Sequence, residues 1–246
     1  MKKLISIGAA LLAGFAIADS VESTTTFGVL KVTTYGKETA ISAPWAAAGG
    51  GDVKVKDLVK TSNLTTGDRL LLYTPADGTY KGWVLNSDGT WEGATTVTSS
   101  GITPAQGGDD TITRGSALIV IENGRDSMTD NNIYLYGQYV STDVTSWTMT
   151  AGKKTLFAPI NTTSTAKSLN DYTWTNVATG DIIQIQDSNS YVRRCKYVTI
   201  DGSSKWAAMN YTTSTYDASL ATIQPGQGAW YISNGTSDVT ASTAAN

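Results

Sequence analysis

The chain has 246 residues, of which 16% are charged, and its net charge is −3. Binding of nucleic acid needs clustered Lys and Arg, and the chain has only isolated basic pairs such as Arg193-Arg194, so this class is excluded. Histidine is absent, which excludes Ser-His-Asp and Cys-His catalysis and His-ligated zinc or iron. A single cysteine, Cys195, excludes thiolate metal clusters and an internal disulfide.

Residues 1–18 have the three parts of a secretory signal peptide. Lys2 and Lys3 precede an apolar run, Leu4–Phe15, which ends at the small-x-small sequence Ala16-Ile17-Ala18. The run is shorter than the roughly 20 residues that span a bilayer, so a membrane anchor is the weaker interpretation. We expect cleavage and export to the periplasm, the cell surface or the extracellular space of a bacterium. No later stretch is apolar enough to span a membrane as a helix, so we expect no transmembrane segment in the mature chain.

Residues 19–26 are predicted to be a flexible N-terminal tail, because Ser20–Thr26 is polar and rich in Thr. A strand is expected directly after it. A free tail beside a sheet can pair with the exposed edge of a neighbouring molecule. The sequence therefore predicts oligomers that form as the concentration rises.

From residue 27 onward, short β-branched or aromatic runs alternate with turn residues, which predicts strands. The clearest runs are Phe27–Thr33, Arg69–Tyr73, Ala117–Ile121, Asn132–Tyr136 and Asp181–Gln186. Turn pairs such as Asp88-Gly89 and Asn123-Gly124 separate them. Only Val53–Lys60 is a candidate helix, and it is short enough to be a strand instead. The pattern predicts an all-β, antiparallel fold.

Five landmarks recur in the same order in both halves of the chain, at offsets of 111 (Gly115 to Gly226) to 116 residues (Thr39 to Thr155). The pairs are Gly36-Lys37-Glu38-Thr39 with Gly152-Lys153-Lys154-Thr155, both before Ala-Pro; Thr66-Gly67-Asp68 with Thr179-Gly180-Asp181; Tyr80 with Tyr191; Asp88-Gly89 and Trp91 with Asp201-Gly202 and Trp206; and Gly115–Gly124 with Gly226–Gly235. Such order predicts a tandem repeat. We expect two internally duplicated antiparallel β lobes, sandwich or barrel-like, at residues 27–140 and 141–246.

The repeated residues are those of turns and strand ends, so we expect the two halves to share their fold and not a functional site. The pattern resembles exported bacterial β-rich proteins with tandem Gly-Lys-x-Thr…Ala-Pro, Thr-Gly-Asp and Pro-Gly-x-Gly-x-Trp lobes. The closing motif is complete only in the second half, as Pro225–Trp230, and Thr113–Leu118 takes its place in the first. No activity is attached to these proteins, so the resemblance implies the fold alone. Any site is expected where the lobes differ.

Carboxylate catalysis, as in glycoside hydrolysis, needs two facing carboxyl groups. Glu92 and Glu122 are the acidic residues that a cleft would use, but their counterparts in the second half are not acidic. We therefore predict no catalytic residue and no enzyme. Calcium is the only cofactor with candidate ligands, namely Asp109, Asp110, Asp126 and Asp130. Their loops lack the helix-loop-helix calcium pattern, and solvated turns are the favoured interpretation.

The chain contains seven Trp and 12 Tyr, and aromatic rings can stack on sugars. The rings that adjoin polar, turn-rich segments are Trp83, Trp91, Trp174 and Trp206, although packing in a β core is favoured for them. Cys195 lies in a strand-like run, so a buried thiol is favoured over an intermolecular disulfide.

The resulting hypothesis is a non-enzymatic, exported structural or surface protein that assembles into a layer, filament or matrix with copies of itself or other surface proteins. The alternative is a carbohydrate-binding module of a secreted or cell-surface system, with glycans as partners.

Overall fold

The structure is a computed structural model that describes residues 27–35, 38–74, 79–98, 101–104, 107–124, 130–138, 146–159, 165–188 and 191–243. The predicted signal peptide, the tail, Gly36-Lys37, Asp126 and the expected lobe boundary at residue 141 lie outside these residues.

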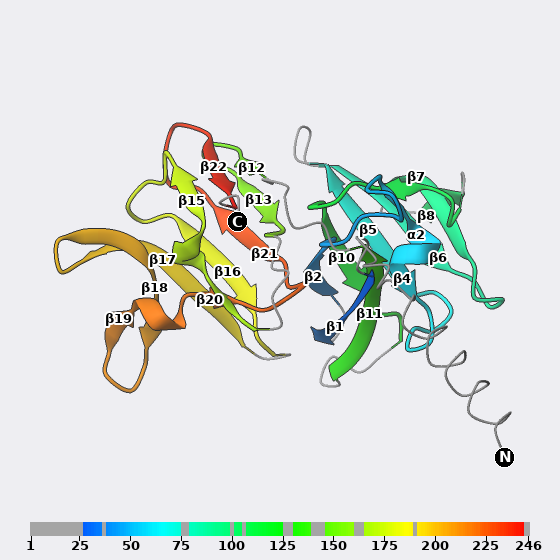
Figure 1. Cartoon of the computed structure of the whole chain (residues 1–246), viewed down its shortest axis with the longest axis horizontal. Coiled ribbons are helices and arrows are strands. Elements are labelled where there is room, and N and C mark those ends of the chain that lie inside the picture. Colours follow the sequence, from blue (N-terminus) through cyan, green and yellow to red (C-terminus); the bar gives the residue numbers. More distant parts are fainter. Residues whose placement is uncertain are drawn as a thin grey trace, which may run out of the picture.

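Residues 27–138 form three antiparallel sheets (Figure 1). The six-stranded sheet has the order β2 (Glu38–Ser42), β10 (Ala117–Ile121), β5 (Arg69–Thr74), β6 (Thr79–Leu85), β7 (Trp91–Thr98) and β8 (Gly101–Pro104). The three-stranded sheet has the order β1 (Phe27–Tyr35), β11 (Asp130–Gln138) and β4 (Val59–Lys60), and β3 (Val53–Lys54) pairs with β9 (Thr111–Ile112). The ambiguous segment Val53–Lys60 contains both kinds of structure, because the short helix α2 (Val55–Leu58) joins β3 to β4.

Residues 146–243 form a second set of sheets with the same strand order. Its six-stranded sheet runs β13 (Lys154–Phe157), β21 (Ala229–Ile232), β16 (Ile182–Gln186), β17 (Val192–Ile200), β18 (Ser203–Asn210) and β19 (Thr215–Asp217). The three-stranded sheet runs β12 (Ser146–Met149), β22 (Val239–Ser242) and β15 (Thr173–Thr175), and β14 (Lys167–Ser168) pairs with β20 (Thr222–Ile223). Two 3₁₀ turns, η1 (Leu169–Asp171) and η2 (Ala218–Leu220), complete this half.

The all-β, antiparallel prediction is confirmed. Every described sheet is open, with two edge strands, so none closes into a barrel. None of the helices in the described residues is long and apolar enough to cross a membrane.

Each half has a hydrophobic core to which its three-stranded and six-stranded sheets both contribute. In the first half, alternation along each strand turns Leu118 and Val120 of β10 and Ile133 and Leu135 of β11 into the same core. In the second half, Cys195 of β17 is fully buried, as predicted. Burial raises the pKa of its thiol to about 11, so the sulfur stays protonated near neutral pH.

Two of the repeated landmarks meet at a buried corner in each half. The carboxylate of Asp68 accepts hydrogen bonds from the backbone N–H groups of Thr65 (2.8 Å) and Asn123 (2.7 Å). The Asp181 carboxylate accepts them from Ala178 (2.9 Å) and Asn234 (2.5 Å). The repeated Gly-Asp and Asn-Gly pairs are therefore two sides of one contact, and both carboxylates are buried.

The two halves pack against each other through a third apolar cluster. Its buried members are Leu71, Tyr73, Ala117, Ile119, Leu156 and Ala158, and Trp230 packs at its border. At the edge of this cluster β2 meets the start of β21, near the middle of Figure 1. There the Ser42 N–H donates to the Gly226 carbonyl (2.8 Å) and the Gly228 N–H donates to the Ala40 carbonyl (2.9 Å). The halves are thus joined by backbone pairing as well as by apolar contact.

Candidate functional site

The four tryptophans predicted for a sugar-binding surface lie in or against the two cores. Trp83 and Trp206 are 0% exposed and Trp91 is 5% exposed. Trp174 is half-buried, and its indole N–H donates to the Leu169 carbonyl (2.7 Å). These rings form no exposed row, so the glycan-binding interpretation loses the residues on which it depended.

Two of the three described acidic residues predicted as calcium ligands, Asp109 and Asp110, face cations or the indole of Trp83. Asp109 lies 2.9 Å from the Lys54 ammonium and 2.7 Å from that of Lys56, and these hydrogen bonds lower its pKa to about 2. Asp110 accepts a hydrogen bond from the Trp83 indole (2.8 Å) and lies 3.2 Å from the Lys81 ammonium. Asp130 lies at the start of β11, opposite Tyr35.

No group of three His, Cys, Asp or Glu that could hold a metal ion occurs among the described residues. The two candidate glutamates differ in their exposure to solvent. Glu92 is exposed on β7, whereas Glu122 is buried and accepts hydrogen bonds from the Thr34 hydroxyl (3.0 Å) and the Asn131 amide (2.6 Å). Glu122 therefore ties β1 to β11 at the end of β10.

The open edge of β1 is the feature that the sequence did not identify. β1 pairs with β11 on one side only. On β11, Gln138 exchanges both backbone hydrogen bonds with Ala46 (3.1 and 2.8 Å), so its N–H and C=O point away from β1. Because these groups alternate in direction along a strand, the N–H and C=O of Phe27 and of every second residue after it point away from β11.

The outward-pointing groups therefore belong to Val29, Lys31 and Thr33 in the middle of the strand. Within the described part of the chain, these backbone groups have no hydrogen-bond partner. At the end of the strand, the backbone groups of Tyr35 also point away from β11, but they have partners. The Tyr35 N–H donates to the Thr39 hydroxyl (2.7 Å), and its carbonyl accepts from the Gln186 side-chain amide (3.2 Å). The ladder of β1 is thus satisfied at one end and open along its centre.

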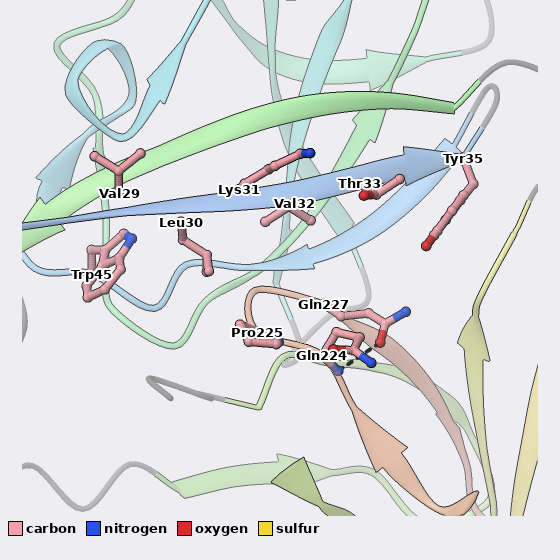
Figure 2. Close-up of a pocket in the computed structure, with 10 residues that line it drawn as sticks. All are labelled: Val29, Leu30, Lys31, Val32, Thr33, Tyr35, Trp45, Gln224, Pro225 and Gln227. Atoms are coloured by element: carbon pink, nitrogen blue, oxygen red, sulfur yellow. Dashed lines mark hydrogen bonds between the residues drawn. The ribbon is translucent and has the colours of Figure 1, made fainter. Parts of the chain in front are cut away.

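A groove of about 640 Å³ runs along this open edge (Figure 2). Consecutive residues of β1, from Val29 to Thr33, line it, as expected for a groove that follows the edge of a strand and not one of its faces. The rest is lined by Tyr35, by Trp45 and by the turn with Gln224, Pro225 and Gln227 from the second half. Figure 2 shows the side chains of Leu30 and Val32 directed from β1 toward this turn.

The groove is built from polar and apolar groups that an extended segment could contact. Gln227 is held in place, since its amide donates to the Gln186 carbonyl (2.7 Å) and its oxygen accepts from the Gln224 N–H (3.0 Å). On the β1 side, Val29 is 58% exposed and Lys31 is exposed. This arrangement can bind a strand by backbone hydrogen bonds, with side chains seated on both rims.

Within the described residues, which exclude 139–145 directly before it, the corresponding strand of the second half offers a shorter edge. β12 has four residues, whereas β1 has nine. Short edge strands are one way in which proteins prevent unwanted pairing. The halves therefore differ where β1 is open, which is where a site was expected.

No protein-family model, curated protein or solved structure matches this chain. The resemblance to exported bacterial tandem-lobe proteins stays a prediction.

Proposed function

We propose that the protein is a non-enzymatic, exported structural or surface protein that assembles with copies of itself by adding a strand to β1. The observation that carries the proposal is the row of unpaired backbone groups at Val29, Lys31 and Thr33, which faces a groove of about 640 Å³. An open edge of this kind is a ready template for an extended segment of another molecule.

We commit to residues 20–26 of a second copy as the occupant. This segment is rich in Thr, which favours an extended conformation, and its one charged residue is Glu22. The exposed charge on the accepting edge is Lys31, so the charges of the two strands are complementary.

The tandem repeat is part of the same proposal. The two halves share their strand order and the buried Asp–Asn corner, which supports descent from one duplicated unit. One copy kept a long open edge and the other has a short one, so each chain would offer one acceptor and one donor. A donor and an acceptor at different places give a head-to-tail interface, which extends into a filament unless it closes into a ring.

Light scattering of the mature protein over a wide concentration range tests the assembly. We expect the mean mass to rise with concentration for the parent protein and to stay at the monomer value for Lys31→Pro. Proline removes the outward N–H of residue 31 but leaves the ladder to β11, so the fold is retained.

Lys31→Ala is the matched control, because it removes the charge and keeps the N–H. We expect it to weaken assembly by no more than about fivefold, the range for one exposed ion pair. Circular dichroism checks that both variants remain folded. A parent protein that stays monomeric at every concentration would overturn the proposal.

A further inference from the structure

The geometry points to a second binding site, for a carboxylated polysaccharide, on the outer face of β16 to β19. A groove of about 320 Å³ lies there, lined by Ile182, Tyr191, Arg193, Arg194, Lys196, Met209, Tyr211 and Tyr216. It has three tyrosines and three basic residues, and no acidic residue lines it. The site is distinct from the β1 edge in both residues and chemistry.

The strand register brings these side chains onto one face. Arg194 and Lys196 are two residues apart on β17, so they point to the same side, about 7 Å apart along the strand. Their neighbour Cys195 points the other way, into the core. Met209 on β18 pairs with Tyr216 on β19, which extends the same face outward.

Two of the three cations are available to a ligand. Arg193 is engaged, since its guanidinium lies 2.8 Å from the Asp187 carboxylate and also donates to the Thr222 hydroxyl (3.2 Å). Arg194 is exposed and Lys196 half-buried, and neither has an ion pair within the described residues. On a protein whose net charge is −3, two free cations in one groove are a local exception that attracts an anion.

The aromatic residues favour a sugar polymer as the carrier of that anion. Tyr211 is 75% exposed, Tyr191 is 42% exposed and Tyr216 is 37% exposed. Exposed tyrosines offer flat apolar faces for sugar rings and hydroxyl groups for hydrogen bonds. The guanidinium of Arg194 matches a carboxylate in geometry, so alternating rings and carboxylates would fit the groove.

The groove is specific to the second half. Cys195 pairs with Ala208 across the sheet, as Trp83 pairs with Gly93 in the first half. Cys195 is therefore structurally equivalent to Trp83. The residues on either side of them, Arg194 and Lys196, are equivalent to Gly82 and Val84 of the first half. The first half therefore lacks both cations, so the shared fold does not require them.

Binding of fluorescent oligogalacturonate to the mature protein tests the inference. We expect the double variant Arg194→Gln/Lys196→Gln to raise the Kd by about tenfold or more, since each cation makes a charge-assisted contact. The charge-matched control is Lys60→Gln/Lys153→Gln, which removes two exposed cations outside the groove, and its Kd should stay within about twofold.

Two further probes separate the sources of affinity. A neutral dextran should not bind, and Tyr211→Ala/Tyr216→Ala should weaken oligogalacturonate binding while leaving any polyphosphate binding unchanged. Absence of oligogalacturonate binding, an equal loss in the charge-matched control, or tighter binding of polyphosphate would overturn the inference. The site depends on the proposed export but not on assembly, so the Lys31→Pro variant should bind oligogalacturonate like the parent protein.

Discussion

At the residue scale, two buried aspartates organise the ends of the central strands. Asp68 and Asp181 each accept backbone N–H groups from a turn before them and from an Asn more than 50 residues later. In the second half the hydroxyl group of Tyr231 also donates a hydrogen bond to the Asp181 carboxylate. Burial and this hydrogen bond raise the pKa of Tyr231 above its ordinary value, which keeps the phenol neutral.

Replacing either aspartate by alanine is expected to lower the free energy of unfolding by about 2–4 kcal/mol, because two backbone N–H groups lose their hydrogen bonds to a buried carboxylate. Urea unfolding monitored by tryptophan fluorescence measures this loss. Asp52→Ala, at an exposed position, is the control and should change stability by less than about 0.5 kcal/mol. Equal stability of all three variants would show that the corners are dispensable.

The sequence predicted the residues that form turns, but it did not predict which polar side chains bond to each other across the fold. Gly67 and Gly180 have φ values of 90° and 99°, which explains why both turns need glycine. The contact between Asp68 and Asn123 was not predictable, since each residue type is also common in ordinary turns. Likewise, the sequence around Trp83 does not indicate that Asp110 satisfies its indole.

At the scale of elements, the five clearest β-branched runs of the sequence coincide with β1, β5, β10, β11 and β16. The predicted correspondence of Tyr80 with Tyr191 is wrong by one residue. Tyr80 pairs with Tyr73 in the first half, and at the equivalent position of the second half Val192 pairs with Gln186. The open edge of β1 could not be predicted, since edge and central strands share the same alternation. It depends on the order of strands in the sheet.

The junction of β2 and β21 gives a second test at this scale. A Cβ on Gly228 would lie 2.9 Å from the backbone of Ala40 and Ile41, so Gly228→Ala should force the two strands apart. We expect a loss of about 1–3 kcal/mol in chemical unfolding. Gly51→Ala, where a Cβ meets nothing within 4 Å, should be within about 0.5 kcal/mol of the parent protein. Similar stabilities of the two variants would mean that β2 and the start of β21 can separate at little cost in free energy.

At the scale of the whole molecule, the two halves share a strand order but not their surfaces. The first half presents the open β1 edge, and the second presents the basic tyrosine groove. Sequence comparison of the halves predicted that any site would lie where they differ; both sites are proposed at such places, and the prediction stays untested. Their positions needed the packing of the halves, because Gln224 and Gln227 reach the β1 groove from the second half.

The most direct test of assembly is light scattering of a mixture of two assembly-deficient proteins. One lacks residues 19–26 and keeps the open β1 edge; the other keeps residues 19–26 and carries Lys31→Pro. We predict that each alone is a monomer and that a 1:1 mixture forms a complex of twice the monomer mass, because one donor meets one acceptor. A mixture that stays monomeric, or a truncated protein that still forms oligomers alone, would contradict the account.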